Sequence, residues 1–299
     1  MTTRTAVAPH PPAPPEPQPA EVFPPPRTPL RPARWLAVVA ADAAELRRFW
    51  PVILNLVSQE LRVRYHRSVL GFCWTLLNPI LMMTVMAMVF SQLMPQGDEP
   101  SKYAIYLFSG MVPWTFLAGS LTESAYCIIS NEGLIRKIYI PKLVFPLTRI
   151  LTNLTTFVLS MGALFLLLVP MGARFSAPLL FLPVAVLLLA VFTLGLGLIL
   201  ATLNTFYRDC GHLVSVFLQA WYFATPIIYR LSIIRSPVAR RRFWLNPAYP
   251  FVRLFQTIID GQQWPDLFTL SLAAGIATVS LGVGYVAFKS HEDKLVFRL

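Results

Sequence analysis

QELRVRYHRSVLGFCWTLLNPILMMTVMAMVF, residues 59–90, joins two segments of opposite character without a linker between them. Basic residues crowd the positions from Arg62 to Arg67, and no charged residue then follows from Ser68 to Gly97. A membrane-spanning helix needs roughly 20 consecutive apolar residues, and basic residues beside a span collect on its cytoplasmic side. The stretch therefore predicts a spanning helix at about 69–91 whose entrance is held at the cytoplasmic surface.

The composition of the chain supports a membrane protein. Of its 299 residues 56% are hydrophobic and only 13% are charged, whereas soluble domains carry roughly 25% charged residues. The net charge of +11 raises the question of nucleic acid. A basic soluble binder would interleave its charges with polar surface, and here they sit beside apolar runs. We therefore expect membrane lipids, and no nucleic acid, as partners.

Further apolar runs predict an all-α protein with six transmembrane helices. The Lys and Arg residues near the ends of these runs favour cytoplasmic N- and C-termini, in a multi-pass protein of the bacterial inner (plasma) membrane. The run at 212–229 is the weakest of the six. The predicted spans are at about 69–91, 104–128, 148–170, 178–203, 212–229 and 267–288.

Three regions follow from this reading. Residues 1–49 form a disordered, proline-rich cytoplasmic tail and lead-in, residues 50–67 an amphipathic helix, and residues 68–299 the transmembrane domain. A helix with an apolar face and a basic edge lies in the plane of the membrane interface, so Arg62 and Arg64 are expected to anchor it near lipid phosphates or a partner protein. An ordinary packed surface helix is the alternative. The predicted apolar face consists of Trp50, Ile53, Leu54, Val57, Leu61 and Tyr65.

Two loops between the predicted spans have unusual patterns. Residues 130–149 mix basic and apolar side chains between Gly133 and Pro141. A stiff helix of one or two turns there could press on a soluble partner and pass force to two spans, although an ordinary positive loop has the same composition. Residues 230–266 contain apolar pieces too short to span, which fits short re-entrant helices covered by protein or water. A miscounted fifth span is the alternative.

The sequence lacks the motifs of several enzyme classes. It has no G-x-x-x-x-G-K-[ST] phosphate loop, no H-E-x-x-H and no G-x-S-x-G, and its four histidines are scattered. We therefore expect no metal site, no bound cofactor and no ATP hydrolysis by this chain. The ionisable residues Glu123, Arg149 and Asp209 fall near predicted cytoplasmic ends rather than at the centres of spans. An ion-coupled carrier or an intramembrane hydrolase would need such residues deeper in the membrane.

The chain resembles the membrane subunit of ABC-2 type polysaccharide exporters, the family that serves O-antigen, capsule and teichoic acid chains. The most specific matches are LVSQELRVRYHRSVLGFCWTLLNPILMM (56–83) and NEGLIRKIYIPKLVFPL (131–147). The proline-rich tail lies outside the resemblance. The other matching stretches are GMVPWTFLAGSLTESA (110–125), NTFYRDCGHLVSVFLQAWYFATPIIY (204–229) and LNPAYPFVRLFQTIIDG (245–261).

The resemblance implies a half-transporter that pairs with a second copy of itself and with two ATP-binding cassette subunits. Those subunits would bind ATP and Mg and hydrolyse the ATP. The family's interface helix corresponds to residues 50–67, its coupling helix to about 132–142, and its short outer gate helices to pieces within 230–266. The predicted contacts with the ATPase are Leu134, Arg136, Lys137, Ile138, Tyr139 and Pro141.

The implied substrate is a lipid-linked polysaccharide, for which a cell-wall galactan is one candidate. A sugar hydroxyl stripped of water without a partner costs roughly 1–3 kcal/mol, so a glycan needs a hydrated path through the membrane. Aromatic side chains could stack on sugar rings along it, or could instead form interfacial belts. A lipid or drug exporter of the same fold, or a polyprenol-linked intramembrane glycosyltransferase, are the alternatives. The candidate path residues are Trp74, Trp114, Trp221, Tyr222 and Phe223.

Overall fold

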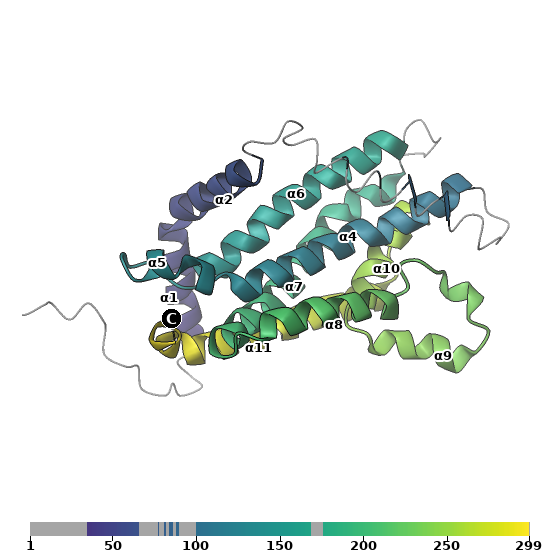
Figure 1. The fold of residues 1–299 in the computed structure, drawn as a ribbon. Coiled ribbons are helices and arrows are strands. Elements are labelled where there is room, and N and C mark those ends of the chain that lie inside the picture. The colour runs from purple at the N-terminus through teal and green to yellow at the C-terminus, as the bar shows by residue number, and fades with distance from the viewer. Residues whose placement is uncertain are drawn as a thin grey trace, which may run out of the picture.

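A computed structural model describes residues 35–65, 100–168 and 176–298, together with isolated helical positions between 77 and 89. Throughout these residues the regular elements are helices, so the predicted all-α class is confirmed (Figure 1). Short 3-10 turns η2–η5 join some of them, at Ile129–Asn131, Ala177–Phe181, Leu231–Ile233 and Phe243–Leu245. The α-helices are α1 (Trp35–Arg48), α2 (Trp50–Tyr65), α4 (Pro100–Tyr126), α5 (Glu132–Ile135), α6 (Val144–Leu168), α7 (Leu182–Phe206), α8 (Cys210–Ala224), α9 (Pro237–Arg242), α10 (Tyr249–Ile259) and α11 (Leu267–Phe297).

Four helical stretches within the described residues are long and apolar enough to cross a membrane. They are Lys102–Tyr126, Val144–Gly162, Ala177–Phe206 and Leu267–Leu295, and they lie side by side in one bundle (Figure 1). Each coincides with a span predicted from the sequence, because a long uninterrupted apolar run is the strongest signal of a spanning helix.

The other two predicted spans have different outcomes. The first, at about 69–91, falls almost wholly outside the described residues. The fifth, at 212–229, corresponds to α8, which has 15 residues. At a rise of about 1.5 Å per residue α8 is ~22 Å long, shorter than the ~30 Å hydrocarbon core of a bilayer. The count of six spans therefore stays a prediction.

Helices α7 and α11 approach each other almost backbone to backbone. A Cβ atom placed on Gly195 would collide with the backbone of Ser280, and one placed on Gly284 would collide with the carbonyl of Gly195. At the same crossing the hydroxyl of Ser280 donates a hydrogen bond of 3.0 Å to the carbonyl oxygen of Phe192. Small residues allow this close packing, which is how helices associate where lipid removes the hydrophobic driving force.

Helix α2 begins and ends close to the predicted amphipathic helix, but it buries a narrower apolar face. Ile53 and Val57 pack into the core against α6, while Trp50 and Leu54 remain 44% and 47% exposed. The predicted face was too wide because the pattern of apolar residues does not show which of them meet a neighbouring helix.

Helix α1 occupies part of the predicted lead-in, for which the sequence suggested no element. Its Asp42 is buried and accepts hydrogen bonds from the Tyr285 hydroxyl at 2.6 Å and the Lys289 ammonium at 2.9 Å, both on α11. These bonds explain why residues 35–48 hold a fixed place on the bundle. The proline-rich residues 1–34 lie outside the described part of the chain.

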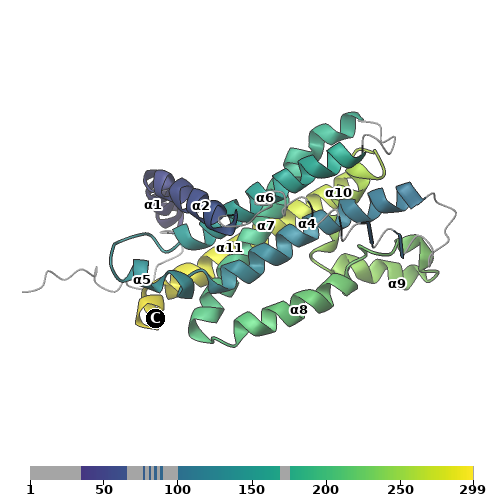
Figure 2. The ribbon, with the colours of Figure 1, turned by 45° about the horizontal axis from the view of Figure 1, so that its top comes forward.

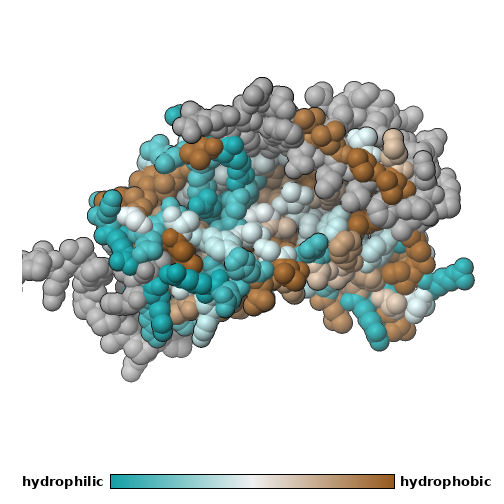
Figure 3. All heavy atoms as spheres, viewed as in Figure 1, coloured by the Kyte–Doolittle hydropathy of each residue, from teal (hydrophilic) through white to brown (hydrophobic). Residues whose placement is uncertain are grey.

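The bundle has two distinct ends. Helices α1, α2 and α5 and the C-terminal end of α11 gather at one end, while α9 and α10 lie at the other (Figures 1 and 2). On the face drawn in Figure 3, hydrophilic side chains gather toward the end that carries α5. The two ends are called the α5 end and the α10 end below.

Candidate functional site

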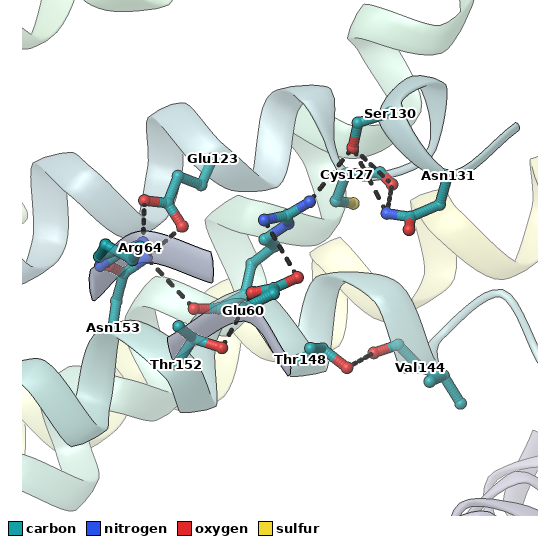
Figure 4. Close-up of polar contacts among 11 residues, drawn as sticks. Glu60, Arg64, Glu123, Cys127, Ser130, Asn131, Val144, Thr148, Thr152 and Asn153 are labelled. Atoms are coloured by element: carbon teal, nitrogen blue, oxygen red, sulfur yellow. Dashed lines mark hydrogen bonds and ion pairs between the residues drawn. The ribbon is translucent and has the colours of Figure 1, made fainter. Parts of the chain in front are cut away.

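At the α5 end, two ion pairs fasten helix α2 to the spanning helices. The Arg64 guanidinium lies 2.7 Å from the Glu123 carboxylate on α4, and the Glu60 carboxylate lies 3.0 Å from the Arg149 guanidinium on α6 (Figure 4). All four side chains are partly shielded from solvent. We call these four residues the α2 clamp.

Neutral side chains complete the hydrogen bonding of the α2 clamp. The Thr152 hydroxyl donates to Glu60 at 2.9 Å, and the Asn153 amide donates to Glu123 at 2.8 Å (Figure 4). The Asn153 oxygen also accepts a hydrogen bond of 3.3 Å from Arg64. Each carboxylate therefore has both a cationic and a neutral partner, which part-buried charges require.

Burial raises the pKa of the Glu60 carboxyl above its ordinary value, and the Arg149 charge and the Thr152 hydrogen bond offset this only in part. Burial thus disfavours the charged form of Glu60, and Arg149 stabilises it. Two acids and two bases together leave the clamp electrically balanced. Such a balanced cluster is suited to positioning a helix rather than to proton transfer.

The clamp changes the interpretation of the basic residues in α2. The sequence suggested that Arg64 faces lipid or a partner protein, whereas the structure shows it bound to α4 within the same chain. Arg62, on the other side of α2, is exposed. Sequence reasoning placed Glu123 and Arg149 near cytoplasmic ends but missed Glu60. Glu60 lies three positions after Val57, and positions i and i+3 share a helix face. This spacing could have indicated that Glu60 faces the bundle.

The second feature of the α5 end is the segment between α4 and α6. Helix α5 covers only 132–135 of the predicted 132–142. Hydrogen-bonded turns continue to Ile138, and an irregular stretch follows to Pro141. The turn is stabilised by an ion pair of 2.7 Å between Glu132 and Arg136. Pro141, at the far end of the segment, is buried. We call residues 132–141 the α5 loop.

The tip of the α5 loop is apolar and exposed, whereas the base of the loop is buried. Ile138 and Tyr139 are 53% and 65% exposed, whereas Ile140 is buried in the core cluster at this end of the bundle. The Tyr139 hydroxyl donates a hydrogen bond of 3.0 Å to Glu45 on α1. Of the other predicted contact residues, Leu134 packs partly against the same core cluster, and Arg136 and Lys137 are exposed.

The aromatic residues predicted to line a glycan path lie together only in part. Trp114 on α4 is buried and packs edge-on against Trp221 of α8, with ring centroids 5.7 Å apart; Tyr222 lies at the same distance. The Trp221 indole donates a hydrogen bond of 2.7 Å to Asn246. Phe223 is exposed, and Trp74 lies outside the described residues. The structure thus joins three of the five aromatics in the contact between α4 and α8.

The part of the chain that the structure describes holds no group of three or more His, Cys, Asp or Glu side chains placed to bind a metal ion. Several ionisable side chains at the α5 end are engaged in pairs between helices, among them those of the α2 clamp. The arrangement can hold helices together and present a docking tip, and neither role requires a reaction at this site.

The chain is similar to proteins that move polysaccharides across membranes. A family model described as ABC-2 type transporter matches residues 51–259, which include the α2 clamp and the α5 loop. An O-antigen export system permease protein, RfbA, from Myxococcus xanthus is 34% identical over 251 residues, covering 84% of this chain and 96% of that protein. An RfbA from Klebsiella pneumoniae is 29% identical over 218 residues, 73% of this chain and 80% of that protein. The polysialic acid transport protein KpsM from Escherichia coli is 22% identical over 246 residues, 81% of this chain and 93% of that protein.

Proposed function

Because this chain belongs to the ABC-2 type transporter family, we propose that it is the membrane subunit of an ATP-driven exporter that carries a lipid-linked polysaccharide out of the cytoplasm across the inner membrane. The observation that carries this proposal is the similarity to an O-antigen export permease over 96% of that protein's length. The bundle of apolar spanning helices is the architecture such a subunit needs. A cell-wall galactan remains one candidate substrate.

ATP binding and hydrolysis belong to a separate subunit in this proposal. The sequence has no phosphate-binding loop of the Walker type, so ATP and Mg would bind to two ATP-binding cassette partners, which assemble with two copies of this chain. The chain itself acts as a transporter subunit and not as an enzyme.

The α5 loop is the proposed contact with the ATPase. Tyr139 offers a large rigid face, of the kind that often dominates the binding energy of a protein interface. Arg136 and Lys137 beside it can pair with acidic residues around a groove. Because the base of the loop is anchored by Ile140 and Pro141, a push on the tip would pass directly to α4 and α6.

The proposed topology has six spans, cytoplasmic termini and an outward-facing α10 end. The α5 loop would then lie in the cytoplasm together with α1 and α2. The short helices α9 and α10 fit the expectation of gate helices at the outer mouth, since they are 6 and 11 residues long. Impermeant labelling of a cysteine introduced at Ser236 tests this orientation, and reaction from the cytoplasmic side alone would contradict it.

The proposal is tested in vesicles that contain this chain, its ATPase partner and a lipid-linked glycan. Tyr139→Ala should remove a contact worth about 2 kcal/mol and uncouple ATP hydrolysis from glycan export. Tyr207→Ala is the matched control, because Tyr207 is a similarly exposed tyrosine (68% against 65%) outside the α5 loop. Both variants should fold and reach the membrane like the unaltered chain.

Two results would overturn the proposal. One is hydrolysis of ATP by the purified chain without a partner. The other is full export by a variant in which residues 134–140 are replaced by Gly and Ser, since this variant has no docking tip.

A further inference from the structure

A polar pocket lies at the α10 end of the bundle, far from the α5 loop. It has a volume of about 350 Å³, at the small end of the range of ligand-binding pockets (roughly 300–1,000 Å³). Its walls come from α4, from the segment that follows α8, from α10 and from the turn after α10. The side chains that matter here are those of Tyr106, Arg230, Arg253, Gln256, Asp260 and Gln263.

Both arginines of the pocket are held in place by aromatic rings. The Arg230 guanidinium lies 4.7 Å from the ring centre of Tyr106 and 3.4 Å from the Asp260 carboxylate. The Arg253 guanidinium lies 5.1 Å from the ring centre of Trp244, and it donates a hydrogen bond of 2.9 Å to the hydroxyl of Tyr249. A guanidinium stacked on a ring keeps a fixed orientation, so these donors are positioned before a ligand arrives.

The Arg253 side chain carries a hydrogen-bond donor that has no partner among the described residues. The Nε of Arg253 is buried and makes no hydrogen bond within the described residues. An unsatisfied buried donor costs roughly 1–3 kcal/mol, and a shift of the Arg253 side chain that brings this donor to a ligand oxygen would recover that cost. The Asp260 carboxylate supplies an acceptor in the same pocket.

The rim of the pocket contains a strained residue. Gln262 has a φ of 48°, the one positive φ among the described residues other than glycine. The turn is tied back to α10, because the amides of Gly261 and Gln263 donate to the carbonyls of Gln256 and Thr257 at 3.0 and 3.1 Å. Strained backbone of this kind gathers at ligand-binding sites, and here it places Gln263 at the pocket.

We propose that this pocket binds a single neutral sugar residue of the exported glycan at the outer end of the transporter. A sugar hydroxyl both donates and accepts hydrogen bonds, which matches the guanidinium, amide and carboxylate groups around the pocket. Asp260 pairs with Arg230 at 3.4 Å, and the charge of Arg253 interacts with the nearby Asp266 carboxylate. Each arginine therefore has an acidic neighbour, and the site offers little reason for an acidic sugar to be preferred. The inference rests on the proposed export of a polysaccharide. It adds a site at the outer end of the transporter that binds the glycan before release.

The test uses the purified full-length chain in lipid nanodiscs, with its three native cysteines replaced by alanine and one cysteine introduced at Gln263. Methyl galactoside, methyl glucoside and methyl mannoside are the probes. Each is titrated while a polar maleimide labels the cysteine. At a concentration of about twice its Kd, a bound sugar should slow labelling about threefold (1 + [L]/Kd). A cysteine at Ser236, which is exposed on α9's first turn and outside the pocket, should react at an unchanged rate.

Saturation-transfer NMR on the unaltered chain gives a second measurement that needs no cysteine. The sugar signals should lose intensity with the unaltered chain and should lose at least half of that effect with Arg253→Gln. Absence of both protection and saturation transfer for all three sugars would overturn the proposal. Protection by inorganic phosphate alone would also overturn it, in favour of an anion site.

Failure of this inference can be told apart from failure of the proposed function. If vesicles export glycan but no sugar binds the pocket, the export function stands and the pocket is not a sugar site. If sugars bind but vesicles with the ATPase partner export no glycan, the pocket assignment stands and the proposed function is wrong.

Discussion

The two ends of the bundle are held together by different kinds of contact. At the α5 end, charged pairs join helices that are far apart in the sequence: Arg64 with Glu123, Arg149 with Glu60, and Lys289 with Asp42. At the α10 end, aromatic packing predominates. Phe192 and Phe251 stack there with ring centroids 4.5 Å apart.

Because of this difference, the contacts at the α5 end can be rearranged more easily than the close packing at the α10 end. The two ion pairs of the α2 clamp are partly open to solvent, and such a pair can break and re-form at low cost because water replaces the partner. The buried Lys289–Asp42 pair is the exception at this end. A stacked aromatic pair depends on close fit, and a gap between the rings cannot be filled by water at comparable energy. We therefore expect movement driven by an ATPase to begin at the α5 end and to pass through α4 and α6 toward a stiffer α10 end.

The largest effect should come from the aromatic end. Phe251→Ala should lower the free energy of unfolding by about 3–5 kcal/mol, because Phe251 is fully buried and stacked on Phe192. Thermal unfolding of the purified chain in detergent measures the change. Phe217→Ala is the control, since Phe217 is 60% exposed. Equal melting temperatures for the two variants would remove the distinction between the ends.

Reversing a charge in the α2 clamp should have the next largest effect. Arg64→Glu places two carboxylates together and should cost about 1–3 kcal/mol in stability, with a loss of export in vesicles. Exchanging the pair, as Arg64→Glu with Glu123→Arg, should restore part of both. Gln59→Glu serves as control, because Gln59 is exposed on the same helix and lies outside the α2 clamp. If the exchange rescues nothing, the pair does not hold α2 in place.

The start of α11 offers a smaller test at the α10 end. The Asp266 carboxylate caps this helix by accepting hydrogen bonds from the Thr269 amide at 3.0 Å and the Thr269 hydroxyl at 2.8 Å. Asp266→Ala should lower stability by about 1 kcal/mol, and Asp266→Asn, which still caps a helix, by much less. Melting temperatures of the two variants measure this. Equal losses with Asn and Ala, which both remove the charge, would show that charge rather than capping is what matters.

The smallest expected effect is a difference in pH dependence between the ends. Burial raises the pKa of Glu60 above 4.5, with Arg149 and Thr152 opposing the rise. For Asp266, burial acts in the same direction, but hydrogen bonds from Thr269 and the charge of Arg253 outweigh it and lower the pKa below 3.8.

The two shifts have opposite consequences for stability. Folded Glu60 binds its proton more readily than unfolded Glu60, so its contribution to stability rises as the pH falls through the window just above 4.5. Asp266 contributes stability above pH 3.8, and this is lost as the pH falls through its lowered folded pKa. The measurement is the melting temperature of each variant from neutral pH to about pH 4. The gain in stability that comes from Glu60 at low pH should be absent in Glu60→Gln and present in Asp266→Asn. Identical curves would contradict the assignment.

The sequence predicted the long helices well and their contacts poorly. The apolar runs at 104–128 and 148–170 correspond to α4 and α6 within a few residues, because burial in lipid leaves a continuous local signal. The α2 clamp has no such signal. Arg64 and Glu123 lie 59 positions apart, and no periodicity within one helix shows which residue of another helix it will meet.

The short elements were predicted only in outline. The α5 loop was located correctly between two spans, but its helical turn ends at Ile135, and the pattern of so short a segment does not show where a helix ends. Helix α1 was missed because its fixed place depends on Asp42 binding to Lys289 at the other end of the chain. The pocket at the α10 end was likewise hidden, because its walls come from segments on either side of α8.

The contact between Gly195 and Gly284 constrains how this molecule can move as a machine. With no side chain between the two backbones, α7 and α11 are in direct contact, and we expect them to move together. If the proposed ATPase contact at the α5 loop moves the bundle, we expect α2, α4 and α6 to shift relative to this pair of helices. A larger residue at either glycine would push α7 and α11 apart, and it would change how the other helices move relative to them.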